Sequence, residues 1–343
     1  MRVAIYGAGA MGTVLGAFLT EGGQAVDLIS RNRDHVEGMK RGGATIRCVA
    51  DGIEKNVAVS VLHPEEMTEK YDVIFLMTKQ KDNEKILTFL KDHLTEDGIV
   101  CTTQNGLPER TVARFVGKDR AYGAAVSFGA TFVGGGVMEL TSSMSAMSVL
   151  CGGYQNDNSK NGLLKEILSK VCSVCGNPDF VTVTENLAGA RFSKLAINSA
   201  FSTLSTITGL TFGEVAKGRK TKRLAVKILR EAIAVAKASG VTLEPMQGHD
   251  MEKLFGGSGF LKTQVVYALL PFAMKKHKLL KSGMLGDIEK GRKCDVDFVC
   301  GALVAAGREV GVETPVAERA VELVHGIENG LYEITPQNVD FLL

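Results

Sequence analysis

The sequence predicts an α/β protein in two parts: a doubly wound parallel sheet, then an all-helical domain. Up to about residue 180, apolar strands alternate with amphipathic helices. Such alternation places parallel strands in one sheet with helices on both faces. A glycine-rich turn at residues 7–12 directly follows the first apolar strand. From Glu185 onward, strand-like alternation nearly vanishes and apolar residues recur at helical spacing.

The length of 343 residues fits two domains at roughly 100–200 residues each. We place them at residues 1–183 and 184–343. The predicted strands are Arg2–Tyr6, Ala25–Ile29, Val73–Met77 and Ile99–Thr102, and the clearest helices between them are Met11–Thr20 and Asp82–Leu94. Residues 121–151, rich in Gly, Ser and Val, are expected to close the far edge of the sheet. The predicted helices of the second domain are Leu187–Leu204, Thr221–Ala238, Val296–Val310 and Pro315–Gly326.

Composition argues against two classes of partner. Lys and Arg total 40 and Asp and Glu total 38, and no basic stripe with interleaved aromatic residues occurs, so we expect no nucleic-acid partner. No stretch reaches the ~18 apolar residues of a spanning helix, so we expect no membrane association. The N-terminus lacks the pattern of a signal peptide, which favours a cytoplasmic protein. The apolar stretch Phe260–Leu270 fits either a homodimer contact or the core.

Cysteine and histidine spacing predicts no metal site. The seven cysteines are irregularly spaced, and Cys172 and Cys175 form one CxxC without a second pair. Cysteines three residues apart are simply explained as part of a helix end. The six histidines show no HExxH or similar spacing.

The glycine turn has the pattern of a Rossmann dinucleotide site, Gly7-Ala8-Gly9-Ala10-Met11-Gly12. GxGxxG alone is a weak signal, but here it lies between a strand and a helix, as the site requires. Gly7 would permit the tight turn, Gly9 the approach of the backbone to the pyrophosphate, and Gly12 close packing of helix and sheet. The helix N-terminus would face the phosphates. The alternative is a merely structural glycine turn.

The end of the second strand favours NADP over NAD. An NAD site usually carries an acidic residue there for the ribose 2′-hydroxyl. Asp27 lies too early in the strand for that role, whereas Arg31 stands at the tip. A guanidinium pairs well with a 2′-phosphate. The alternative is that Arg31 is an exposed loop charge.

A polar stripe marks the start of the second domain. Lys194, Asn198 and Ser202 are spaced i, i+4, i+8 on an otherwise largely apolar helix, so we expect them on one face. An exposed face would usually carry more charge. We therefore favour a stripe that faces a cleft opposite the nicotinamide over one that faces solvent.

Taken together, several segments resemble the ketopantoate reductase (2-dehydropantoate 2-reductase) family. They are GAGAMG at 7–12, Arg31, Lys79 in FLMTKQ, Gln104-Asn105-Gly106, KLAIN at 194–198 and the tail that begins DIEKGRKCDVDFV. The similarity runs over nearly the whole chain. It implies NADPH-dependent reduction of a 2-oxo acid, with 2-dehydropantoate, which becomes pantoate in pantothenate biosynthesis, as the favoured substrate.

The resemblance also implies roles for single residues. Lys194 would be the general acid that protonates the ketone oxygen. Cofactor contacts would come from Lys79, Asn105, Gly129 and Asp295, and substrate contacts from Asn105, Asn198, Ser202 and Ser282.

Four positions depart from the family pattern. Asp295 stands in place of Glu, Ser202 and Phe212 in place of Asn, and Gly283 in place of Ser. A site that loses hydrogen-bonding groups discriminates its substrate less well. A related 2- or 3-oxo acid or an imine therefore stays open as the substrate. A non-catalytic NADP-binding sensor is a third alternative, against which Lys194 argues.

Overall fold

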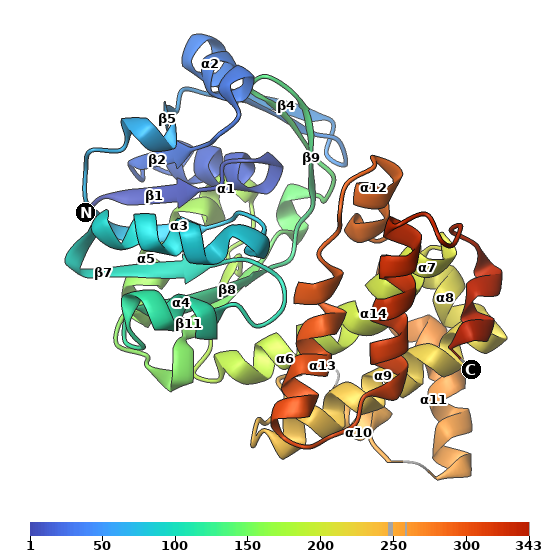
Figure 1. Cartoon of the computed structure of the whole chain (residues 1–343). Helices are drawn as coiled ribbons and strands as arrows, with labels where there is room; N and C mark the ends of the chain where they lie inside the picture. The colour runs from blue at the N-terminus through green and yellow to red at the C-terminus, as the bar shows by residue number, and fades with distance from the viewer. Residues whose placement is uncertain (246–249, 258, 343) are drawn as a thin grey trace. The chain divides into compact units, whose positions relative to one another are not determined.

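The chain forms two compact units in a computed structural model that describes residues 1–245, 250–257 and 259–342. The first unit comprises Met1–Gln104 and Pro108–Leu187, and the second comprises Asn105–Leu107 and Ala188–Leu343. The first unit is a sheet with helices, and the second is helical (Figure 1). The predicted fold class is confirmed.

The main sheet has eight strands in the order β12-β11-β8-β7-β6-β1-β2-β5. The six strands from β8 to β5 run parallel, and β11 pairs antiparallel with β8. Their bounds are β1 Val3–Tyr6, β2 Val26–Ile29, β5 Ser60–Leu62, β6 Tyr71–Leu76, β7 Leu94–Thr102, β8 Ala121–Val126, β11 Val149–Gly153 and β12 Val181–Val183. The strand order reverses between β1 and β6. In doubly wound sheets ligands bind at this switch point, beyond the carboxyl ends of the strands.

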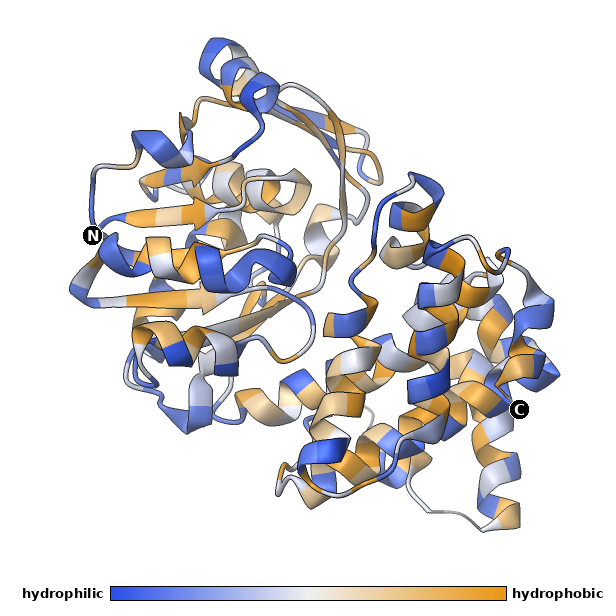
Figure 2. Cartoon of the chain, viewed as in Figure 1, coloured by the Kyte–Doolittle hydropathy of each residue, from blue (hydrophilic) through white to orange (hydrophobic). Residues whose placement is uncertain are grey.

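Helices cover both faces of this sheet, and alternation along β1 shows how. Val3 and Ile5 join one core with α1 (Ala10–Glu21) and α5 (Asn161–Cys175). Ala4 and Tyr6 join a second core, to which α3 (Asn83–Asp92) and α4 (Glu109–Val116) also contribute. Successive strand residues point to opposite faces, so a strand buried on both is apolar throughout. Most of β1 is accordingly coloured as hydrophobic in Figure 2, which has the view of Figure 1.

A second sheet of four strands in the order β4-β3-β10-β9 was not predicted. Its bounds are β3 Ala44–Cys48, β4 Ile53–Val57, β9 Ala130–Gly134 and β10 Val137–Leu140. The expectation that residues 121–151 close the edge of the main sheet holds for β8 and β11 and is wrong for β9 and β10. Helix α1 packs against strands of both sheets, which explains why residues 12–19 are all buried.

His35 joins three segments of the first unit. It lies in α2 (Arg33–Gly42) and is fully buried. Its Nε2 is 2.9 Å from the Thr13 hydroxyl, and its Nδ1 accepts a hydrogen bond from the Gly136 N–H at 3.1 Å. Burial lowers the pKa of His35, although a hydrogen bond to the Ala8 backbone opposes this effect. The native state therefore holds this imidazole neutral.

We expect His35 to make the folded state less stable as the pH falls from about 7 to about 5.5. The unfolded chain, with a histidine pKa near 6.5, binds this proton more readily than the folded chain, so stability rises with pH in this window. A His35→Gln variant does not titrate here, and its free energy of unfolding should depend less on pH. Urea denaturation at both pH values measures the difference. Equal pH dependence in the two chains would exclude His35 as its source.

The second unit packs around α9 (Arg219–Ala238), of which ten residues are buried. The other helices are α6 Leu187–Ile197, α7 Thr203–Thr208, α8 Phe212–Lys217, α10 Met251–Phe255, α11 Phe260–Ala273, α12 Gly283–Glu289, α13 Cys300–Glu309 and α14 Pro315–Glu328. The Glu231 carboxylate in α9 accepts the backbone N–H groups of Val316 and Ala317, both at 2.9 Å. A carboxylate at a helix N-terminus satisfies free donors and complements the helix dipole. It thereby fixes α14 against α9.

The apolar stretch Phe260–Leu270 falls in α11 and is only partly core. Val266 and Leu270 are buried, whereas Phe260, Leu261 and Val265 are exposed. Among the residues that the structure describes, every helix is too short or too polar to cross a bilayer.

Candidate cofactor and active site

The glycine turn after β1 leaves room for side chains at only one of its three glycines. Gly7 has a φ of +106°, and a Cβ there would lie 2.6 Å from the Thr78 backbone nitrogen. A Cβ on Gly12 would lie 2.5 Å from the Gly7 carbonyl oxygen. A Cβ on Gly9 would meet nothing within 4 Å. Gly7 and Gly12 are thus required by the turn itself, and the open side of Gly9 is free for a ligand to approach.

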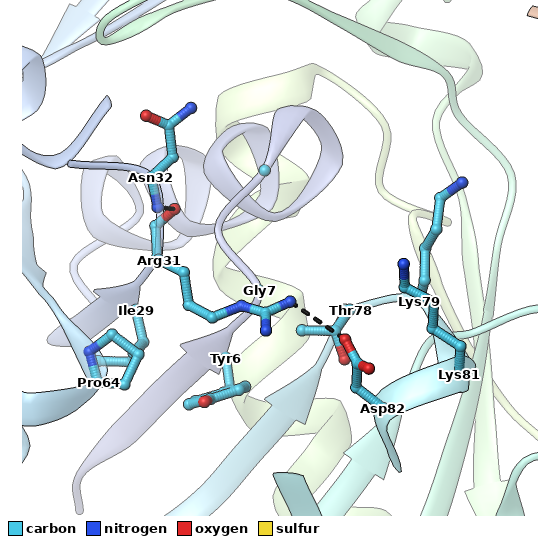
Figure 3. A pocket seen from close by; sticks show the side chains of 12 residues that line it. Tyr6, Gly7, Ile29, Arg31, Asn32, Pro64, Thr78, Lys79, Lys81 and Asp82 are labelled. Atoms are coloured by element: carbon cyan, nitrogen blue, oxygen red, sulfur yellow. Dashed lines mark hydrogen bonds and ion pairs between the residues drawn. The ribbon is translucent and has the colours of Figure 1, made fainter. Parts of the chain in front are cut away.

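A pocket of about 310 Å³ opens beside this turn (Figure 3). It lies at the carboxyl ends of β1, β2 and β6, at the switch point of the sheet. Its lining residues are Tyr6, Gly7, Gly9, Ile29, Ser30, Arg31, Asn32, Pro64, Thr78, Lys79, Lys81 and Asp82. Four of the predicted cofactor residues, Gly7, Gly9, Arg31 and Lys79, are therefore brought together. Ala8, Ala10, Met11 and Gly12 belong to the same turn and the start of α1.

The tip of β2 presents Arg31 to this pocket. Asn32 caps α2 by accepting the His35 N–H at 3.1 Å, which fixes where the strand ends and the helix begins. Arg31 is mostly exposed, and its Nη2 lies 3.3 Å from the Asp82 carboxylate. Asp27 takes no part, because its carboxylate accepts hydrogen bonds from Ser60 at 2.5 Å and Tyr71 at 2.9 Å.

A buried amide pair holds the end of β7, just before Asn105. The Asn83 and Gln104 side chains exchange two hydrogen bonds, at 2.7 and 3.0 Å. Gln104 also donates to the Thr78 carbonyl at 2.8 Å and accepts from the Thr102 hydroxyl at 3.0 Å. These bonds tie together the ends of β6 and β7 and the start of α3. The exposed Asn105 follows directly and is grouped with the second unit.

In the second unit, the predicted polar stripe lies on a nearly buried segment. From Gly189 to Thr208, all of which the structure describes, every residue is buried except Lys194, Ile197, Asn198 and Ser202. The helix is interrupted where the stripe lies: α6 ends at Ile197, and a π-helical turn spans Asn198–Ser202 before α7 begins. Such turns occur frequently at functional sites. The three polar residues are therefore half-buried polar positions in an otherwise almost fully buried segment.

The Lys194 ammonium is electrostatically destabilised. Burial of the ammonium, and secondarily the positive charge of Arg191, lower the pKa of Lys194 from 10.5 to about 7. Arg191 is itself fully buried, one helical turn before Lys194. A lysine with a pKa near neutrality can exchange a proton with a substrate under physiological conditions.

The other predicted substrate positions lie near α7 and α12. Ser282 is buried and caps α12 by accepting the Met284 N–H at 3.1 Å, and the Thr206 hydroxyl donates to its oxygen at 3.1 Å. The Thr206 hydroxyl oxygen also lies 2.8 Å from the Ser202 carbonyl oxygen, so Thr206 links Ser202 to Ser282. Phe212 is buried with its ring centroid 5.9 Å from that of Phe201 and belongs to the core.

Asp295 and Gly129 lie outside the pocket described above. The backbone N–H of Cys294 donates to Glu328 at 2.7 Å, which fixes the loop that carries the half-buried Asp295. Gly129 follows β8, where its N–H donates to the Ser142 hydroxyl at 3.0 Å and its carbonyl accepts the Thr141 N–H at 2.9 Å. A Cβ at position 129 would approach Thr141 Oγ1 to 2.7 Å, so the local packing itself favours glycine.

Lys81 and Asp82 line the pocket but were not predicted from the sequence. Both follow β6 in the short turn that also carries Lys79. The available signal was their place just beyond the carboxyl end of a strand next to β1. Among the described residues, no group of three or more His, Cys, Asp or Glu side chains is placed to hold a metal ion.

Two family models match the chain. The model described as "Ketopantoate reductase PanE/ApbA" matches residues 3–149, and "Ketopantoate reductase PanE/ApbA C terminal" matches residues 186–328. The chain belongs to the ketopantoate reductase family. Ketopantoate reductases are NADP-dependent oxidoreductases that act on a CH–OH group, so the chain is an oxidoreductase of this type.

Similar proteins cover almost the whole chain. The 2-dehydropantoate 2-reductase of Lactococcus lactis subsp. lactis (strain IL1403) is 25% identical over 332 residues, which are 96% of this chain and 98% of the relative. D-mandelate dehydrogenase, solved with NADH and anilino(oxo)acetate, superposes with a TM-score of 0.80 at 24% identity over 96% of this chain and 99% of its own. A PanE/ApbA family ketopantoate reductase from Ralstonia eutropha JMP134 gives 0.77 at 23% identity, with coverage of 96% and 99%.

Proposed function

We propose that this chain binds NADPH on its α/β unit and reduces a small 2-oxo acid to the 2-hydroxy acid, with 2-dehydropantoate as the favoured substrate. The observation that carries the proposal is the polar stripe of Lys194, Asn198 and Ser202 on an otherwise buried segment, with a lysine pKa near 7. A protein that only bound the dinucleotide would have no need of an acid there. The names of the relatives support the same reaction class.

The residues of the first unit fit a dinucleotide. Gly9 leaves open space beside the pocket, where a phosphate can come close to the backbone. The first turn of α1 offers N–H groups and the positive end of the helix dipole. Arg31 and Lys79 supply positive charge for a 2′-phosphate. We also assign cofactor contacts to Gly129 of this unit and to Asn105 and Asp295, which belong to the second unit.

When bound, NADPH supplies the hydride that the carbonyl carbon accepts. Lys194 acts as the general acid: its Nζ donates a proton to the ketone oxygen, and its positive charge stabilises the negative charge that develops there. A pKa of about 7 leaves a large fraction of the ammonium protonated at neutral pH and makes the proton easy to donate. Asn198, Ser202 and Asn105 hydrogen-bond the substrate, and Ser282 supports it beside Ser202.

The substrate side differs from the family pattern in ways that bear on specificity. Phe212, where the family has Asn, is part of the hydrophobic core and offers no hydrogen bond. Ser202 is shorter than the Asn it replaces. A 2-oxo acid with fewer hydroxyl groups than 2-dehydropantoate is therefore the second candidate.

A substrate panel tests this function. The oxidation of NADPH by the purified chain is followed with 2-dehydropantoate, other 2-oxo acids, 3-oxo acids, and 2-oxo acids mixed with amines. We expect the highest kcat/KM with a 2-oxo acid alone. A preference for 3-oxo acids or imines would overturn the substrate class. Tight NADPH binding without turnover of any compound would favour a sensor instead.

A further inference from the structure

The proposed cofactor pocket contains a carboxylate directly opposite its arginine. Asp82 Oδ2 lies 3.3 Å from Arg31 Nη2, and both residues line the pocket beside Gly7 and Gly9. The guanidinium extends from the tip of β2 toward Asp82, which comes from the turn after β6 (Figure 3). The two residues are 51 positions apart in the sequence, so the fold creates this pair.

A capping hydrogen bond does not explain the position of the Asp82 carboxylate. Asp82 is the residue that precedes α3, a place where aspartate commonly caps a helix with its side chain. Here the side chain makes no such capping hydrogen bond. It pairs with Arg31 instead, although the lysines at positions 79 and 81 line the same pocket. The pocket lining therefore combines three cationic side chains with one carboxylate.

We propose that Asp82 sets the cofactor preference of this chain by competing with the 2′-phosphate of NADPH for Arg31 and by accepting the ribose 2′-hydroxyl of NADH. The proposal rests on the dinucleotide site put forward above. A 2′-phosphate that pairs with Arg31 must displace the carboxylate and is then repelled by it. NADH has no 2′-phosphate, so it neither displaces the carboxylate nor is repelled by it, and the Arg31–Asp82 pair can stay intact. The chain is thus expected to use both cofactors, with a modest preference for NADPH.

The chemistry of the two cofactors supports this assignment. In NAD sites an acidic side chain at the end of the second strand binds the ribose 2′-hydroxyl, and in NADP sites a nearby arginine accommodates the 2′-phosphate. Here Arg31 stands at the end of the second strand, and the Asp82 carboxylate reaches it from the turn after β6. This pocket carries one of each within ion-pair distance. Specificity is a difference between two affinities, and a repulsive group raises or lowers it as effectively as an attractive one.

The solvent exposure of the Arg31 and Asp82 side chains sets the size of the expected change in NADPH affinity. The side chains of Arg31 and Asp82 are 65% and 36% exposed, so solvent weakens their attraction. Removal of the carboxylate should therefore tighten NADPH binding by about three- to tenfold rather than by orders of magnitude. The gain should shrink as salt screens the charges.

The test is a comparison of Asp82→Asn with the wild-type chain. Dissociation constants for NADPH and NADH are measured by titration of cofactor fluorescence, at low and at moderate salt. We expect a lower Kd for NADPH and an unchanged or higher Kd for NADH. Asp82→Ser, which shortens the side chain, should change the ratio of the two constants in the same direction.

Glu84→Gln is the matched control. Glu84 lies two residues after Asp82 in the sequence. Its carboxylate pairs with Arg114 at 2.9 Å, and neither residue lines the pocket. This variant loses the same charge and should leave the ratio of the two constants unchanged.

Two results would overturn the proposal. In the first, the ratio for both Asp82 variants stays within about twofold of wild type. In the second, Glu84→Gln changes the ratio as much as Asp82→Asn does. Failure of the dinucleotide site itself is seen separately, because the wild-type chain would then bind neither cofactor; that result overturns both proposals together.

Discussion

Replacement of Lys194 by alanine is expected to lower the rate of 2-oxo acid reduction by about 10²- to 10⁴-fold, the usual contribution of a general acid. The developing charge on the ketone oxygen would then have neither a proton donor nor a nearby ammonium. The Kd for NADPH should stay within about twofold of wild type, because the glycine turn and Arg31 lie in the other unit. Stopped-flow measurement of NADPH oxidation, together with cofactor titration, separates the two effects.

Two further variants control this experiment. Lys194→Arg keeps the positive charge but cannot donate a proton at neutral pH, so it should recover only part of the lost rate. Lys217→Ala removes an exposed lysine of the same unit and should leave the rate unchanged. Turnover of Lys194→Ala at the wild-type rate would show that another group protonates the product.

Gly7→Ala is expected to destabilise the α/β unit by about 2–4 kcal/mol and to abolish NADPH binding. The backbone of Gly7 has a φ of +106°, which disfavours any side chain. The added Cβ would also lie 2.6 Å from the Thr78 backbone nitrogen, and a backbone atom cannot move aside as a side chain would. Urea denaturation gives the free energy of unfolding, and cofactor titration gives the affinity.

Gly9→Ala separates the fold from the binding site. Its Cβ would meet no atom within 4 Å, so stability should stay within about 1 kcal/mol of wild type. The methyl group would occupy the side from which a phosphate approaches, so the Kd for NADPH should rise about tenfold or more. Equal stabilities of Gly7→Ala and Gly9→Ala would contradict the assignment of Gly7 to the turn and Gly9 to the ligand.

The main sheet was predictable because its signals are local. Strands buried on both faces are apolar throughout, and the predicted start of β1 and the predicted start and end of α1 differ from the structure by one residue. The second sheet was not predictable in this way. Its strands are short and partly exposed, and β3 pairs with β10, so that Thr45 lies opposite Val137. No local pattern indicates a pairing across so many residues.

The candidate site, like the fold, was predictable only where the signal is local in the sequence. Arg31 and Lys194 were found because a strand end and a polar stripe can be seen in the sequence. Asp82 was predicted only as the first residue of a helix, and not as a site residue. Its partner Arg31 is 51 positions away in the sequence and is brought near it only by the folded sheet. The predicted helix 187–204 is also interrupted at Asn198–Ser202, where the π-helical turn makes the spacing of the stripe differ from that of a regular helix.

The pH dependence of hydride transfer tests the central claim most directly, since Lys194 must be protonated to act as the acid. The rate of NADPH oxidation in a single turnover, with saturating 2-oxo acid, is measured from about pH 6 to about pH 9 in the wild-type chain and in Lys194→Ala. We predict a wild-type rate that falls as the pH rises through about 7, the pKa of Lys194, and a low rate in the variant that does not change over this range. A wild-type rate that stays constant across the range, or a variant that keeps the same pH profile, would contradict the role of Lys194.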